Sequence, residues 1–212
     1  MLGMHGNYGP NIKTNECDVL IALGMRFDDR VTGDVKTYAT QAKIIHFEID
    51  PSEVDKNIKA DVAVIGDLKE TLPALISRVK ENSHSSWLNE FEKAYQVEYE
   101  NVIHPELFPE KGELTMGEVV HRISDFVKGD AIIVTDVGQH QMVAARYSHL
   151  NLSRSIVTSG GLGTMGFGLP AAVGAKIGRP DRHVVAFIGD GGFQMTIQEL
   201  GTIAQSGIAV KI

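Results

Sequence analysis

The sequence predicts an α/β protein built from two parallel-sheet units. Short apolar runs rich in β-branched residues alternate with helical patterns, and many of the 22 glycines stand where these runs end. Such runs, without regular polar positions, are typical of parallel strands covered on both faces. The 212 residues, of which 43% are hydrophobic and 22% charged, suffice for one or two modest cores.

The first unit is expected to be an α/β domain over residues 1–80. Its strands are predicted at 18–24, 43–49 and 61–66. Apolar residues then recur at helical spacing from Leu68 to Val79, which predicts a helix that packs back on the sheet.

Residues 81–113 are interpreted as a linker. A polar stretch leads into aromatic residues at helical spacing and then into a proline-bearing segment. Aromatic residues in this pattern are usually packing residues, and we assign that role to Trp87, Phe91, Tyr95 and Tyr99.

The second unit is expected over residues 114–212. Thr115 and Glu118 have the spacing of a capping box, which predicts a helix start. Strands are predicted at 131–135, around Ile156 and at 183–188, with a helix over 168–177, so that parallel crossovers follow. Residues 208–212 have the pattern of a further buried strand, and we therefore expect the domain to be truncated.

Composition and charge argue against several classes of protein. The net charge of -7 and pI near 5.6, without a basic patch, argue against nucleic-acid binding. No apolar run is long enough to span a bilayer, and residues 1–6 lack the pattern of a signal peptide. The single cysteine, Cys17, fits a reducing compartment, so we expect a cytoplasmic protein.

Gly189-Asp190-Gly191-Gly192 marks a candidate site because it stands where an apolar strand gives way to a helix, predicted over 194–205. Ligands of open parallel sheets collect at this place, and glycine amides at a helix start favour an anion such as a diphosphate. Asp190 would supply an oxygen ligand for magnesium. The motif alone is equally compatible with a plain β-to-α turn.

Two further segments point to the same rim of the sheet. Gly138, Gln139 and His140 follow an earlier strand and would bring polar side chains to phosphate oxygens. The glycine-dense segment 159–168, with Gly163 and Met165, follows the next strand and could approach a flat ligand. Taken singly, His140 is as compatible with a surface histidine, and Met165 with a core residue.

Together these motifs resemble the acetolactate synthase large subunit, a thiamine-diphosphate enzyme. The resemblance rests on 137–141, 159–172, 189–192 and Gly24–Gly33, and covers nearly the whole chain. It implies that Gln139 and His140, beside Gly138, meet the diphosphate and that Asp190 ligates Mg²⁺. Amides of Gly191 and Gly192 would contact phosphate oxygens, while Gly163 and Met165 would approach the aminopyrimidine.

The resemblance also implies a structural FAD in the first unit. Gly24, Arg26 and Arg30 would lie along it, Glu48 and Ile49 near its adenosine end, and Asp67 beside the last strand. The residues themselves support this less strongly, since the Gly-x-Gly-x-x-Gly fingerprint is missing. Glu48 is as compatible with a solvated strand end, and the arginines could pair with Asp28 and Asp29.

By the same resemblance, the parent enzyme decarboxylates pyruvate and condenses the two-carbon unit with a second 2-oxo acid in isoleucine, valine and leucine biosynthesis. It would be a homo-oligomer and could pair with a regulatory small subunit. The segment would contain no catalytic residue, because the activating glutamate and the asparagine ligand of Mg²⁺ would lie outside it. We therefore expect the isolated chain to be inactive.

Other interpretations stay open at this point. The chain could be a noncatalytic fragment that binds FAD or another nucleotide. It could also be a segment of glyoxylate carboligase, a 2-oxo acid decarboxylase or pyruvate oxidase. The Gly24–Gly33 segment favours acetolactate synthase over these enzymes.

Overall fold

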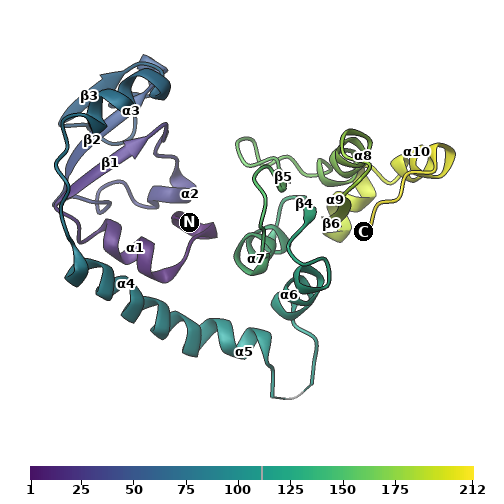
Figure 1. Ribbon diagram of the computed structural model, residues 1–212. Coiled ribbons are helices and arrows are strands. Elements are labelled where there is room, and N and C mark those ends of the chain that lie inside the picture. Colours follow the sequence, from purple (N-terminus) through teal and green to yellow (C-terminus); the bar gives the residue numbers. More distant parts are fainter. Residues whose placement is uncertain (111) are drawn as a thin grey trace. The chain divides into compact units, whose positions relative to one another are not determined.

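The computed structural model describes residues 1–110 and 112–212, and it divides into two units, residues 1–100 and 101–212 (Figure 1). Within the described residues, each unit contains a three-stranded parallel sheet with helices packed against it. The predicted α/β class is therefore confirmed. None of the helices in this part of the chain is both long enough and apolar enough to cross a membrane.

The sheet of unit 1 contains the three strands that the sequence predicted. They are β1 (Val19–Leu23), β2 (Lys43–Glu48) and β3 (Val62–Ile65), in the spatial order β1-β2-β3. Short helices stand between and before the strands: η1 (Gly3–His5), α1 (Tyr8–Thr14), α2 (Asp29–Thr32) and η2 (Pro51–Glu53).

The two faces of this sheet differ in burial. Ala22 of β1 and Ile44 of β2 belong to a buried cluster with Phe27. On the opposite face, helix α3 (Leu68–Ile76) packs against β2 and leaves the outer residues of β1 exposed, with Ile21 46% accessible. The expectation that the strands are covered on both faces is therefore wrong for β1 and also for β3, none of whose described residues is buried.

The segment interpreted as a linker is largely helical where the structure describes it; its residue 111 lies outside the described residues. It holds α4 (Ser85–Glu98), the π-helical turn η3 (Tyr99–Ile103) and α5 (His104–Leu107). Helix α4 packs on α1, where Lys13 Nζ lies 2.5 Å from a carboxylate oxygen of Glu90 and 5.2 Å from the ring centre of Trp87. Phe91 contacts Trp87 edge to face, so the packing role of these two aromatic residues is confirmed.

The sheet of unit 2 has its first strand in the middle. The order is β5 (Ile156–Thr158), β4 (Ala131–Thr135) and β6 (His183–Phe187), all parallel. Residue Lys211 forms a parallel bridge to Val185 at the outer edge of β6. The buried strand predicted at 208–212 is therefore confirmed only as this single pairing, since among the described residues the segment forms no further bridge and none of its residues is buried.

Strand β4 is covered on both faces, as predicted. Helix α8 (Gly168–Gly178) packs on the face that carries Ile132 and Val134, while α6 (Met116–Phe126) and α7 (Gln139–Tyr147) lie on the side of β4 that carries Ile133. All five residues of β4 are buried.

Two predicted helix signals are confirmed only in part. The hydroxyl of Thr115 accepts a hydrogen bond from the Glu118 amide at 3.1 Å, but the Glu118 carboxylate accepts from Arg122 instead of completing a capping box. The helix predicted over 194–205 is divided into α9 (Asp190–Met195) and α10 (Glu199–Ser206). Between them, the hydroxyl of Thr196 donates to the carbonyl of Gly166 at 3.2 Å, which ties the break to another loop.

Candidate cofactor site

The candidate site lies at the carboxyl ends of the strands of unit 2. Because β4 stands between β5 and β6, the segments that leave β4 and β5 enter helices on opposite faces of the sheet. Such a switch point opens the crevice in which α/β sheets bind ligands. We call residues 136–138, 159–168 and 188–192, which include the start of α8 and the first turn of α9, the rim loops.

Asp136 joins all three rim loops. Its side chain is 1% exposed, and its carboxylate accepts hydrogen bonds from the amides of Val137 at 2.7 Å, Gly166 at 3.0 Å and Gly168 at 3.2 Å. A Cβ on Gly192 would lie 2.7 Å from the same carboxylate, so only glycine lets the start of α9 approach this closely. Sequence reasoning missed Asp136; its signal was an acidic residue that directly ends an apolar strand.

The loop with Met165 lies against the Gly-Asp-Gly-Gly turn. The methyl carbon of Met165 is 3.3 Å from the place that a Cβ on Gly191 would take, although the side chain stays 47% exposed. Gly163 adopts a φ of +61°, which favours glycine, and its amide donates to the Ser159 carbonyl at 2.7 Å. The structure therefore brings the second and third rim loops together.

His140 lies between the first and third rim loops. Its ring carbon Cε1 is 2.9 Å from the Cβ position of Gly138 and 3.1 Å from that of Gly189. Burial lowers the pKa of the imidazole, and the nearby Asp136 carboxylate offsets this only in part. The ring is therefore favoured in its neutral form, and its Nε2 is buried without a hydrogen-bond partner among the described residues. Gln139, the first residue of α7, is exposed beside it.

Asp190 is exposed at the first position of α9. Within the part of the chain that the structure describes, its carboxylate has neither a hydrogen bond nor an ion pair, so it is available to a cation. The backbone amides of Gly191 and Gly192 belong to the first turn of a helix, where amides lack helical partners. Amide donors and a free carboxylate thus stand side by side, as an anion with its counter-cation requires.

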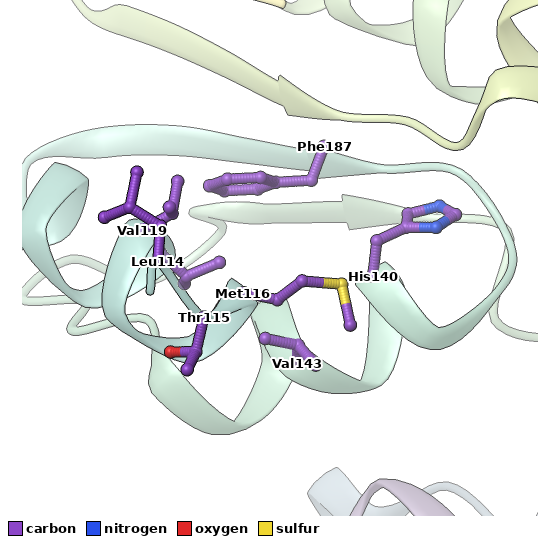
Figure 2. A pocket seen from close by; sticks show the side chains of 8 residues that line it. Leu114, Thr115, Met116, Val119, His140, Val143 and Phe187 are labelled. Carbon is purple, nitrogen blue, oxygen red and sulfur yellow. The ribbon is translucent and has the colours of Figure 1, made fainter. Parts of the chain in front are cut away.

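An apolar cavity of about 200 Å³ lies beside His140 (Figure 2). Figure 2 shows the imidazole at one end of this cavity, near the Phe187 ring and the Met116 side chain. The apolar lining explains the low-dielectric surroundings of the imidazole. The cavity is lined by Leu114, Thr115, Met116, Val119, Val120, His140, Val143 and Phe187.

A second polar network, also missed from the sequence, fastens β4, β5 and α7. The hydroxyl of Thr135 donates to that of Thr158 at 2.8 Å, and the side-chain amide of Gln141 donates to the same Thr158 oxygen at 2.7 Å. These bonds hold the first rim loop and its helix against β5.

In unit 1, the residues expected to bind FAD follow the carboxyl ends of β1, β2 and β3. Gly24 adopts a φ of +61°, and Ile49 is 66% exposed. Glu48 is buried, and its carboxylate accepts hydrogen bonds from the amides of Ile49 and Asp50. The alternative interpretation of Glu48 as a solvated residue at a strand end is therefore wrong. Asp67 caps α3 by accepting from the Lys69 amide at 2.9 Å.

The two arginines of this group form ion pairs with neighbouring residues. Arg26 Nε lies 3.3 Å from Asp28, and Arg30 Nη1 lies 3.1 Å from Asp29, the pairing that the sequence left open as an alternative. Both pairs are exposed enough to exchange for a phosphate at small cost.

Two models of one protein family match the two units. The thiamine pyrophosphate enzyme central domain matches residues 1–75, and the C-terminal thiamine pyrophosphate binding domain of the same enzymes matches residues 136–212. The second match contains all three rim loops. The chain belongs to the thiamine pyrophosphate enzymes.

Within that family the chain is similar, over its whole length, to acetolactate synthase large subunits. It is 47% identical to that of Parasynechococcus marenigrum (strain WH8102), covering 100% of this chain and 34% of the relative. A probable acetolactate synthase large subunit of Methanococcus aeolicus is 44% identical (100% and 37%), and isozyme 2 of Escherichia coli (strain K12) is 43% identical (100% and 37%). The chain thus spans about a third of the length of these relatives.

Proposed function

We propose that this chain is a segment of an acetolactate synthase large subunit and supplies part of its thiamine-diphosphate site. The parent enzyme would decarboxylate pyruvate and condense the two-carbon unit with a second 2-oxo acid, in isoleucine, valine and leucine biosynthesis. The observation that carries the proposal is the convergence of the three rim loops on Asp136, within the segment that matches the cofactor-binding family model. The relatives favour this enzyme over the other members that the sequence left open.

In this proposal, different residues of the rim bind different parts of the cofactor. The amides of Gly191 and Gly192 and the side chains of Gln139 and His140 bind the diphosphate. A neutral His140 donates one N–H to a phosphate oxygen, and its buried Nε2 without a partner is the observation that supports this role. Gly138 allows the close approach of His140, whose Cε1 would be 2.9 Å from any Cβ there.

The magnesium site is proposed at Asp190. Mg²⁺ prefers oxygen ligands and commonly binds through one or two carboxylates, phosphate oxygens and water, so an exposed, unpaired carboxylate beside free amides fits it. Gly163 and Met165 are proposed to bound the aminopyrimidine, with Met165 held over Gly191. When bound, thiamine diphosphate supplies the carbanion-stabilising chemistry, while the protein binds and orients it. No residue of this segment is assigned a catalytic role.

A structural FAD is proposed at the carboxyl ends of β1, β2 and β3. Gly24, with Arg26 and Arg30, would lie along the cofactor, with Glu48, Ile49 and Asp67 on the neighbouring strand ends. The exposed ion pairs of the two arginines support this role because they can be exchanged for phosphate contacts.

The partners of the parent enzyme belong to the same proposal. The relatives are named large subunits, and this name supports a smaller, regulatory partner. A homo-oligomer of the parent enzyme would complete the thiamine-diphosphate site. The single cysteine, Cys17, supports a cytoplasmic location.

Calorimetric titration of the 212-residue chain with thiamine diphosphate tests the proposal. We expect binding that requires Mg²⁺ and that Asp190→Asn weakens on the order of 10-fold or more, since one carboxylate ligand is lost. Asp181→Asn is the matched control, because Asp181 is an exposed aspartate of the same unit that pairs with Arg179. Binding that ignores Mg²⁺ or is unchanged in Asp190→Asn would refute the assignment, and acetolactate formation by the pure chain would refute the expected inactivity.

A further inference from the structure

Two histidines and an aspartate lie together at the end of β4 opposite Asp136. His121 and Asp125 are one turn apart on α6, and His149 follows α7. A ring nitrogen of His149 is 3.0 Å from Nδ1 of His121, and Nε2 of His121 is 3.3 Å from a carboxylate oxygen of Asp125. One possible ligand atom from each residue lies within 4.8 Å of the other two.

The segment that carries His149 is fastened to the end of α6. The amide of His149 donates to the hydroxyl of Ser124 at 3.2 Å, and Ser124 is only 1% exposed. Two residues further on, Asn151 donates from its side chain to the Lys128 carbonyl at 2.9 Å and from its amide to Gly129 at 3.1 Å. The backbone of unit 2 therefore holds the three residues near one another. Their proximity does not depend on the side-chain rotamers alone.

We propose that His121, Asp125 and His149 form a binding site for a zinc ion. Two imidazoles and one carboxylate are a ligand set that Zn²⁺ uses, with water in the fourth position. Bond lengths of about 2.0–2.2 Å place tetrahedral ligand atoms about 3.3–3.6 Å apart. The spacing between His149 Nε2 and His121 Nδ1, 3.0 Å, already lies near this value, whereas Asp125 faces the other ring nitrogen of His121, Nε2, at 3.3 Å.

The third ligand can adjust without disturbing the fold. Asp125 is 63% exposed in its side chain, so it can rotate toward an ion bound between the two imidazoles. His121 would bind through one ring nitrogen and leave the other for a hydrogen bond. Zinc would thus clamp α6 to the segment between α7 and β5, separately from the all-oxygen chemistry at Asp190.

The test is a titration of the metal-free 212-residue chain with ZnCl₂ in excess Mg²⁺, which occupies oxygen-ligand sites. We expect one equivalent to bind, Co²⁺ to give the visible absorption of a tetrahedral complex, and Zn²⁺ to raise the melting temperature of the chain. His121→Gln, His149→Gln and Asp125→Asn should each weaken zinc binding on the order of 10-fold or more, as loss of a ligand removes one coordinate bond.

His183→Gln is the matched control because His183 is exposed in the same unit, and His84→Gln is the control in unit 1. Both should bind zinc as the unchanged chain does, and circular dichroism should show each variant to be folded. A chain that binds no zinc, or one whose affinity survives all three ligand substitutions, would overturn the site. Loss of binding in His183→Gln would likewise overturn it and place the ion elsewhere.

Discussion

The two units carry similar apolar strands, but among the described residues only unit 2 joins the loops after its strands through one buried carboxylate. In unit 2, one buried carboxylate bonds amides of two rim loops and contacts the third. In unit 1, Glu48 and Asp67 each accept hydrogen bonds from amides of their own loop. The two sheets also differ in burial, because β4 is covered on both faces while β1 exposes one face. The units thus differ in the group that bonds across loops, a buried carboxylate in unit 2 and the exposed side-chain amide of Asn57 in unit 1, and the strand pattern displays neither.

Replacing the central carboxylate should have the largest effect. Asp136→Ala leaves the amides of Gly166 and Gly168 without their acceptor, and each unsatisfied buried donor costs about 1–3 kcal/mol. Asp67→Ala removes only a helix cap, which costs about 0.5–2 kcal/mol. Urea unfolding followed by circular dichroism and by the fluorescence of Trp87, which reports on unit 1, would measure both.

We expect Asp136→Ala also to abolish thiamine diphosphate binding in the calorimeter, while Asp67→Ala preserves it. Equal losses of stability in the two variants, or cofactor binding that survives Asp136→Ala, would contradict the central role of Asp136.

A smaller difference in stability is expected between matched substitutions in the two sheets, because the middle residues of β4 and β1 are packed differently. Ile133 of β4 is 1% exposed and Ile21 of β1 is 46% exposed. Ile133→Val should lower the free energy of unfolding by about 0.5–1.5 kcal/mol, whereas Ile21→Val should stay within about 0.5 kcal/mol. The same urea titrations measure both values. A larger loss for Ile21→Val would mean that the outer face of β1 is covered in solution.

The smallest expected effect is a change in pH dependence at His140. Because burial lowers its pKa in the folded protein, the unfolded chain binds more protons as the pH falls below about 6.5. Stability from this group is present above that pH and is lost as the pH falls through the folded pKa. His140→Gln should therefore flatten the decline of the urea midpoint over this interval, while His183→Gln leaves it unchanged. A decline of equal steepness in all three proteins would show that His140 does not contribute.

The strands and most helices could be predicted from the sequence because their signals are local. Runs of β-branched residues marked β4 and β6 nearly to the residue, and Thr115 marked the start of α6. The exposed face of β1 could not be predicted, because the same run of residues fits a strand with one or two covered faces. The break after α9 was missed because it depends on a bond from Thr196 to a loop thirty residues earlier.

The position of the candidate site could be predicted where glycines are dense in the sequence. It could not be predicted where one residue forms hydrogen bonds or contacts with several loops. The rim loops were found because Gly138, Gly163 and Gly192 stand at strand ends. Asp136 was missed because its importance lies in contacts with residues 30 to 56 positions away, which the sequence does not display. The cofactor-binding roles of the predicted residues stay predictions.

Sharing one acceptor has a consequence for motion at the rim. The amides of Val137, Gly166 and Gly168 bond to the same carboxylate, so one loop cannot open far without releasing a partner of the others. Such elements behave as a single cooperative opening unit in native-state hydrogen exchange. Entry and release of a ligand there would then proceed by concerted loosening of the whole rim, at one common free energy, instead of by the flapping of an individual loop.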